Sequence, residues 1–110
     1  MRESEIQQQI RAALGRGHGL VLWRNSTGIA ERDGRTHRFG LCRGSADLIG
    51  ILSPSGRFVA LEVKRPNGKP TEEQTLFLEL VRKQGGFAAV VDSVDSALAA
   101  VDRAKRGESR

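Results

Sequence analysis

Two acidic residues and a lysine border apolar segments of the chain, at positions that suit a metal site. Asp47 begins the apolar run 47–52, and Glu62 and Lys64 lie at the end of the run 58–64. Two carboxylates placed side by side repel, and their burial costs several kcal/mol unless a positive charge lies between them. A divalent cation together with the Lys64 ammonium group would supply that charge. The alternative is an ordinary Glu–Lys pair on the surface of an edge strand.

The two runs must be brought together for this chemistry. Segment 53–56 joins them and contains a proline and a glycine, which predicts an antiparallel hairpin. Strand side chains alternate between faces, so Glu62 and Lys64 share one face. Asp47 opens one strand and Glu62 lies near the end of the other, so both carboxylates are expected at the same end of the hairpin. Gly44, three residues before Asp47, predicts a tight turn or a close approach of the backbone to a ligand.

A third acid lies on the first predicted helix, which runs from Glu3 to about Leu14 and is followed by glycines. The apolar side of this helix comprises Ile6, Ile10, Ala13 and Leu14. Glu3 falls on that side, where an acid needs a partner or a function. Alternatively, Glu3 is solvated at a frayed terminus, where its charge suits the helix dipole.

A second helix is predicted to start at Thr71 and to end before Gly85. Gln74 follows Thr71 by three residues, which is the spacing of a capping box. Gln74 also lies on the same side as the core residues Phe77, Leu78 and Val81. It therefore either caps the helix or directs its amide group into the site.

Basic residues gather in loops and in one predicted arm. Asp33-Gly34 is typical of a two-residue hairpin turn, which predicts a polar β-arm over 29–39. Such an arm is either simply solvated or grips a nucleic-acid backbone. The candidate nucleic-acid-binding residues are Arg24, Asn25, Arg32, Arg35, Arg38, Arg43, Arg65 and Lys69.

The remaining segments complete a fold of the α/β class. Strands are predicted over 20–23 and 87–91, a last helix over 94–104, and a frayed tail over 105–110. This order predicts a central mixed β-sheet flanked by helices. The length of 110 residues fits one domain, which we expect to span the whole chain.

Composition indicates the kind of partner. Lys and Arg outnumber Asp and Glu by 18 to 13, which gives a net charge of +5 and favours an anionic partner, nucleic acid first. The lone Cys42 excludes an internal disulfide, and we expect it to be buried. No apolar run has membrane-spanning length, so we expect a cytoplasmic protein, in a bacterial or virus-infected cell, with no membrane partner.

These residues together resemble the PD-(D/E)xK nuclease superfamily, and specifically a stand-alone VRR-NUC domain, over nearly the whole chain. Ala46 stands where the superfamily has its eponymous proline before the first acid. The matching positions are Glu3 ahead of Ile6, Gly44-Ser45-Ala46-Asp47, Glu62-Val63-Lys64, Gln74, and Gly85-Gly86 with the strand 87–91.

The resemblance implies a restriction-endonuclease-like fold and a catalytic set of Asp47, Glu62, Lys64 and Gln74. Asp47, Glu62 and the Val63 carbonyl would hold Mg²⁺ or Mn²⁺, which prefer such oxygen ligands, and Glu3 would join directly or through water. Lys64 would either activate the attacking water or remain charged and stabilise the phosphate.

The implied activity is hydrolysis of phosphodiester bonds by a DNA endonuclease that selects branched substrates such as Holliday junctions. Cutting two strands symmetrically would need two active sites, so we expect a homodimer. The alternative is a non-catalytic nucleic-acid-binding module on the same fold, which would have no need for Asp47, Glu62 and Lys64 together.

Overall fold

The computed structural model describes residues 1–15 and 17–110. The helices and strands in these ranges follow the predicted order, and their ends lie within a few residues of the predicted ones. They are α1 (Glu3–Leu14), β1 (Leu20–Arg24), β2 (Gly28–Arg32), β3 (Arg35–Phe39), β4 (Leu48–Leu52), β5 (Arg57–Val63), α2 (Glu72–Lys83), β6 (Phe87–Val91) and α3 (Val94–Lys105).

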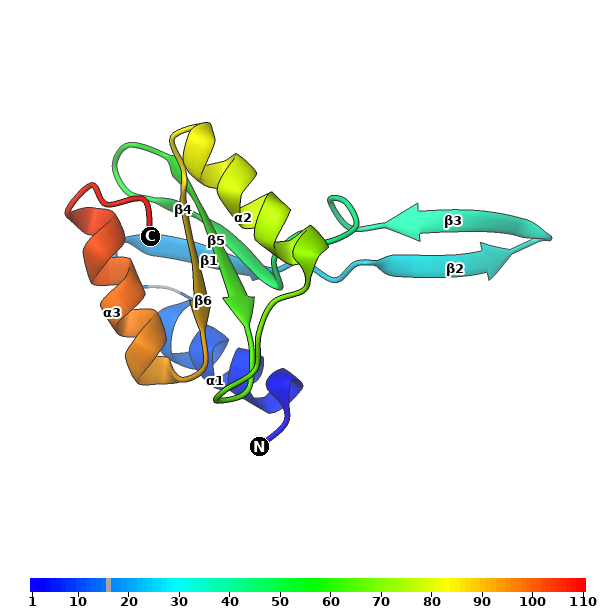
Figure 1. The fold of residues 1–110 in the computed structure, drawn as a ribbon, viewed down its shortest axis with the longest axis horizontal. Coiled ribbons are helices and arrows are strands. Elements are labelled where there is room, and N and C mark those ends of the chain that lie inside the picture. Colours follow the sequence, from blue (N-terminus) through cyan, green and yellow to red (C-terminus); the bar gives the residue numbers. More distant parts are fainter. Residues whose placement is uncertain (16) are drawn as a thin grey trace.

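Four strands form the central sheet in the order β1-β4-β5-β6. The β1–β4 and β4–β5 pairs are antiparallel and the β5–β6 pair is parallel, which confirms the predicted mixed sheet. Helices α1 and α3 pack together on one face of the sheet, and α2 lies on the other face (Figure 1). The molecule therefore has three layers, with a sheet in the middle.

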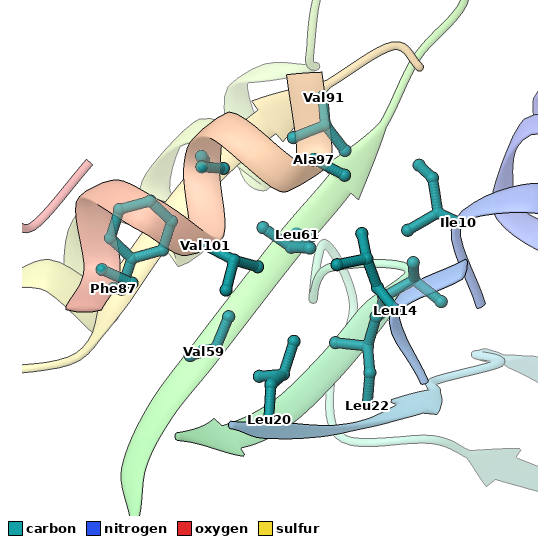
Figure 2. Packing of buried hydrophobic residues seen from close by; sticks show 14 of the residues in the cluster. Ile10, Leu14, Leu20, Leu22, Val59, Leu61, Phe87, Val91, Ala97 and Val101 are labelled. Atoms are coloured by element: carbon teal, nitrogen blue, oxygen red, sulfur yellow. The ribbon is translucent and has the colours of Figure 1, made fainter. Parts of the chain in front are cut away.

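The larger core lies between the sheet and the layer formed by α1 and α3. Alternate strand residues such as Leu20, Leu22, Val59 and Leu61 point into it, as a period of two requires (Figure 2). Burying these branched aliphatic side chains stabilises the fold by about 1.5–3 kcal/mol each. A smaller cluster beneath α2 comprises Ala46, Ala60, Leu78, Val81 and Ala88, with Phe58 and Phe77 partly buried beside it.

Strands β2 and β3 form a two-stranded arm that stands away from the body of the protein (Figure 1). Its turn places Asp33 at φ 53° and Gly34 at φ 73°, which confirms the predicted hairpin. The arm leaves β1 at the end where Arg24 pairs with Leu48, directly beside Asp47. It therefore projects from the end of the sheet that carries the acidic pair.

The carboxyl-terminal residues differ from the expected frayed tail. The Ser109 carbonyl accepts a hydrogen bond of 3.0 Å from the Ala88 N–H of β6. The Arg103 guanidinium donates to the Arg110 carbonyl at 3.2 Å. The tail therefore lies against the start of β6, because these long-range partners compensate for the entropy lost on ordering it.

Candidate active site

The structure brings Asp47 and Glu62 together at one end of the hairpin formed by β4 and β5. Leu48 pairs with Leu61, so the residues next to them, Asp47 and Glu62, face each other across the strands. The Asp47 N–H donates to Glu62 Oε2 at 3.4 Å, and the Val63 N–H donates to Asp47 Oδ2 at 2.9 Å. Both carboxylates are thus positioned by the backbone of the neighbouring strand.

Glu62 carries an ionisable group in a nearly water-free position, since only 1% of its surface is exposed. Burial and the adjacent Asp47 carboxyl group raise the pKa of Glu62 from 4.5 to about 8, while the Lys64 charge lowers it less strongly. At neutral pH the Glu62 carboxyl group is therefore mostly protonated unless a cation takes the place of the proton.

The pair fits a hard divalent cation. Glu62 Oε1 is buried without a hydrogen-bond partner, which is costly for a polar atom and leaves an acceptor available for an ion. Carboxylate and carbonyl oxygens suit Mg²⁺, which often uses only one or two protein carboxylates and keeps several waters. Within residues 1–15 and 17–110, no three His, Cys, Asp or Glu side chains gather as a metal cluster.

Glu3 is accordingly not grouped with Asp47 and Glu62. It is half-buried at the start of α1 and lines a shallow hollow with the loop that follows β5, including Arg65 and Gly68. The structure therefore places Glu3 beside the loop that follows Lys64, and its predicted role at the metal, directly or through water, stays a prediction.

Lys64 follows Glu62 by two residues and lies on the same face of the sheet, half-buried at the end of β5. The backbone N–H of Lys64 donates to the Val91 carbonyl at 3.0 Å, which fixes the backbone at this point. The positive charge of Lys64 lowers the pKa of Glu62. The lysine is thus close enough to act on the carboxylates electrostatically.

Gln74 caps α2, which is the first of its two expected roles. Its side-chain oxygen accepts from the Thr71 N–H at 2.8 Å, and its own N–H donates to Thr71 Oγ1 at 3.2 Å. This reciprocal pair satisfies two N–H groups that the helix end would otherwise leave unpaired. Gln74 therefore contributes by holding the amino-terminal end of α2 in place.

Asn25 is half-buried and links β1 to the loop before Asp47, while its predicted contact with nucleic acid stays a prediction. Its Nδ2 donates to Ser45 Oγ and to the Ala46 carbonyl, both at 2.8 Å, and its Oδ1 accepts from the Leu41 N–H at 3.3 Å. Its own N–H donates to the Asp47 carbonyl at 2.8 Å. Sequence reasoning missed these contacts, because partners so far apart along the chain leave no local pattern in the sequence.

Ser45 is a second residue whose role sequence reasoning missed. Its hydroxyl donates to the Cys42 carbonyl at 2.7 Å and accepts from Asn25, so it links the loop before β4 to the end of β1. Its position in the segment Gly44–Asp47 was the only indication available. The loop that carries Asp47 is therefore held by a small hydrogen-bond network.

Gly44 supports the same loop by a close approach to helix α2. It adopts φ 83°, which favours glycine, and a Cβ atom there would lie 2.8 Å from the Glu73 carbonyl oxygen of α2. Arg43, a predicted nucleic-acid contact, instead pairs with the Glu73 carboxylate at 3.1 Å on the exposed surface. Such exposed pairs contribute little stability, so Arg43 remains easily displaced.

The other basic candidates are exposed but do not form one patch. Arg32 pairs with Arg35, so both lie on one face of the arm, whereas Arg38 pairs with Ile29 on the opposite face. The remaining exposed candidates are Arg24 at the end of β1 and Arg65 and Lys69 in the loop after β5.

Cys42 is also exposed, so the prediction that it is buried was wrong.

We expect Asn25→Ala to destabilise the protein by about 2 kcal/mol, because it leaves partners in the loop before Asp47 unpaired. Urea unfolding followed by circular dichroism measures this change. Ser26→Ala is the matched control, since Ser26 is the exposed neighbour and its substitution should change stability by less than about 0.5 kcal/mol. Equal effects of the two substitutions would contradict a special role for Asn25.

The sheet, the helices and the paired acids define a protein with a restriction-endonuclease-like fold. The VRR-NUC domain family matches residues 1–95, and the chain belongs to this family of nucleases. A solved structure described as a VRR_NUC domain is 26% identical, with a TM-score of 0.62, and the match covers 91% of this chain and 94% of that one.

A second solved structure, described as a VRR_NUC domain protein, is similar over 100% of this chain and 97% of that chain. Its TM-score is 0.64 at 20% identity, which supports the fold alone. A comparison with curated proteins found no match. Among the residues that the structure describes, no helix is both long and apolar enough to cross a membrane.

Proposed function

We propose that this chain is a metal-dependent DNA endonuclease that hydrolyses phosphodiester bonds in branched DNA and acts as a homodimer. The observation that carries the proposal is the buried Glu62 beside Asp47, with Glu62 Oε1 left without a partner. A binding module would not need to maintain such a pair, because burying two adjacent acids is unfavourable. A nuclease needs it to hold a cation at the scissile phosphate.

Asp47, Glu62 and the Val63 carbonyl would hold Mg²⁺ or Mn²⁺, with Glu3 reaching the ion through a water molecule. When bound, such an ion would supply Lewis-acid chemistry, polarising the phosphate and lowering the pKa of a water molecule. Lys64, whose positive charge lowers the pKa of Glu62, would stabilise the negative charge that develops on the phosphate oxygens.

Exposed basic residues would hold the DNA backbone around this site. Arg24 ends β1 beside Leu48 and lies on the α1 side, Arg65 and Lys69 belong to the loop that follows β5, and the arm carries further arginines. Each arginine or lysine that neutralises a phosphate releases a counterion, so binding should weaken steeply as salt concentration rises. These contacts position the DNA and carry no sequence information.

A cleavage panel tests the proposed function. Four-way, flapped, bulged and linear DNA are incubated with Mg²⁺, Mn²⁺ or EDTA, and the products are separated on denaturing gels. We expect cleavage of branched DNA with either metal, slower cleavage of linear DNA, and none in EDTA. Tight binding of these substrates without cleavage under any metal condition would identify a non-catalytic binding module instead.

A further inference from the structure

A hollow of about 670 Å³ lies where the arm formed by β2 and β3 joins the body of the protein. The start of β2 and the end of β3 form part of its wall, and the loop that curls at the base of the arm after β3 forms the rest (Figure 1). Pockets of about 300–1,000 Å³ are typical of sites that hold small organic ligands. We call this hollow the arm pocket, and it is lined by residues 27–29 and 38–43.

Three large apolar side chains line the arm pocket and are open to solvent. Ile29 is 59% exposed, Phe39 is 50% exposed and Leu41 is 55% exposed. They come from both faces of the arm and from the loop, since Ile29 pairs with Arg38 whereas Phe39 pairs with Gly28. Large apolar side chains that gather in one hollow mark a place where a ligand with an apolar surface binds.

Phe39 supplies an aromatic ring that is held in place. A Cβ atom at Gly28 would lie 2.5 Å from Cζ of Phe39, so the tip of the ring occupies the space that the glycine leaves free. The residue is nevertheless half exposed. A ring that is fixed at one end and open to solvent offers a surface on which a flat ring system can stack.

Two arginines give the arm pocket a positive charge. Arg38 and Arg43 line it and are exposed, and none of residues 27–29 and 38–43 is acidic. The contact of Arg43 with the exposed Glu73 carboxylate contributes little stability, so a phosphate can replace it. Guanidinium groups bind phosphate oxygens through two parallel hydrogen bonds. The pocket therefore suits a ligand that combines a flat apolar ring with a phosphate.

Hydrogen bonds connect the arm pocket to the loop that carries Asp47. The Leu41 N–H donates to Asn25 Oδ1 at 3.3 Å, and the Asn25 N–H donates to the Asp47 carbonyl at 2.8 Å. The Cys42 carbonyl accepts from the Ser45 hydroxyl at 2.7 Å. A ligand in the arm pocket is therefore held in a fixed relation to the acidic pair.

We infer that the arm pocket binds one unpaired nucleotide of the DNA substrate, with its base stacked on Phe39 and its phosphate held by Arg38 and Arg43. A paired base is stacked inside the duplex, whereas an unpaired base at a bulge or branch point leaves the stack at little cost. The inference deepens the proposed endonuclease and rests on that function for its biological role. It names the feature by which the protein would distinguish branched DNA from linear DNA.

Two matched duplexes test the inference in EDTA. One carries a single-nucleotide bulge, and the other carries the same bulge without its base, so that both have the same backbone and charge. Fluorescence anisotropy should show about 10-fold tighter binding of the duplex that retains the base, because stacking on an aromatic residue contributes affinity of this order. Equal affinities would overturn the inference and leave the arm pocket to another occupant, such as a protein segment.

This comparison requires neither metal nor cleavage. A protein that prefers the base but cuts no DNA would contradict the proposed nuclease activity and support the arm pocket. A protein that cuts branched DNA but binds both bulges equally would do the reverse. The two failures are therefore distinguishable.

Substitutions of Phe39 locate the base. Phe39→Leu should remove the preference for the base, since leucine keeps the space beside Gly28 filled but has no aromatic ring. Phe39→Tyr should retain the preference. Trp23→Ala is the matched control, because Trp23 is 49% exposed but lies outside the arm pocket. An equal loss of preference in Trp23→Ala and Phe39→Leu, with circular dichroism showing both folded, would overturn the assignment of the base to Phe39.

Substitutions of the arginines locate the phosphate. Arg38→Gln and Arg43→Gln should weaken binding of both duplexes by the same factor, because phosphate contacts do not depend on the base. Each should also reduce the dependence of log K on log salt by about 1. Arg106→Gln is the matched control, since Arg106 also pairs with an exposed carboxylate but lies at the end of α3. An unchanged salt dependence in Arg38→Gln and Arg43→Gln would exclude a phosphate from the pocket.

Cys42 reports directly on occupation of the arm pocket. It is the only cysteine of the chain, it is exposed, and it lines the pocket. A saturating amount of the bulged duplex should slow the reaction of Cys42 with N-ethylmaleimide several-fold more than the duplex without the base does, because the base would cover the thiol. Mass spectrometry follows the reaction. Equal protection by the two duplexes would place the base outside the arm pocket and overturn the inference.

Discussion

Lys64→Ala is expected to cut DNA about 1,000-fold more slowly than the wild-type protein while binding DNA nearly as tightly. Lys64 lies on the same face as Glu62 at the end of β5, where its charge acts on the acidic pair. Without the positive charge of Lys64, the negative charge that develops on the phosphate oxygens in the transition state is less well stabilised. Single-turnover cleavage of a labelled four-way junction measures the rate, and fluorescence anisotropy with EDTA present measures binding.

Two further variants make this result specific. Lys64→Arg retains a permanent charge but cannot act as a base, so it should recover part of the lost rate if charge stabilisation is the role of Lys64. Lys83→Ala removes an exposed lysine at the far end of α2 and should leave the rate unchanged. A Lys64→Ala protein that cuts as fast as the wild type would exclude Lys64 from catalysis.

Glu62→Gln is expected to abolish detectable cleavage and at the same time to stabilise the metal-free protein at alkaline pH. The substitution removes a proposed metal ligand, and it replaces a buried ionisable group by a neutral one of the same shape. Few substitutions combine a loss of activity with a gain in stability. That combination is typical of a residue retained for function at a cost to folding.

The pH dependence of unfolding provides the measurement. The pKa of Glu62 is raised in the folded protein to about 8 from 4.5, so the folded state holds a proton that the unfolded chain has released. Wild-type stability in EDTA should therefore fall as pH rises from 4.5 to about 8, by up to about 1.4 kcal/mol per pH unit. Glu62→Gln should lack this fall.

Divalent metal and a surface control complete the experiment. Mg²⁺ or Mn²⁺ should restore wild-type stability at pH 8 by binding the folded state, and should have little effect on Glu62→Gln. Glu79→Gln makes the same chemical change on the exposed side of α2 and should retain both the wild-type pH dependence and the response to metal. Identical unfolding profiles for the wild type and Glu62→Gln would contradict the raised pKa.

Local patterns in the sequence were sufficient for the elements and for the central pair. Apolar spacing and the Asp33-Gly34 turn predicted the helices and the arm, because each depends on neighbours within a few residues. The hairpin geometry also predicted that Asp47 and Glu62 would meet, since a short turn between two strands leaves little freedom in their pairing.

Contacts between distant segments determined the rest, and no local pattern predicted them. Asn25 followed a strand, where substrate contacts are common, yet it binds the loop before Asp47 across some twenty residues of chain. The ordered tail depends on β6 in the same way.

The sequence alone thus determined which residues could form an acidic site and the kind of fold that carries it. Only the tertiary structure decided that Glu62 is buried deeply enough to hold a proton at neutral pH, and that Trp23 of β1 and Ile51 of β4 stay exposed on the side of the sheet that carries α2. The physical reason is that burial depends on how whole layers pack, whereas a sequence pattern records only which side of its own element a residue occupies.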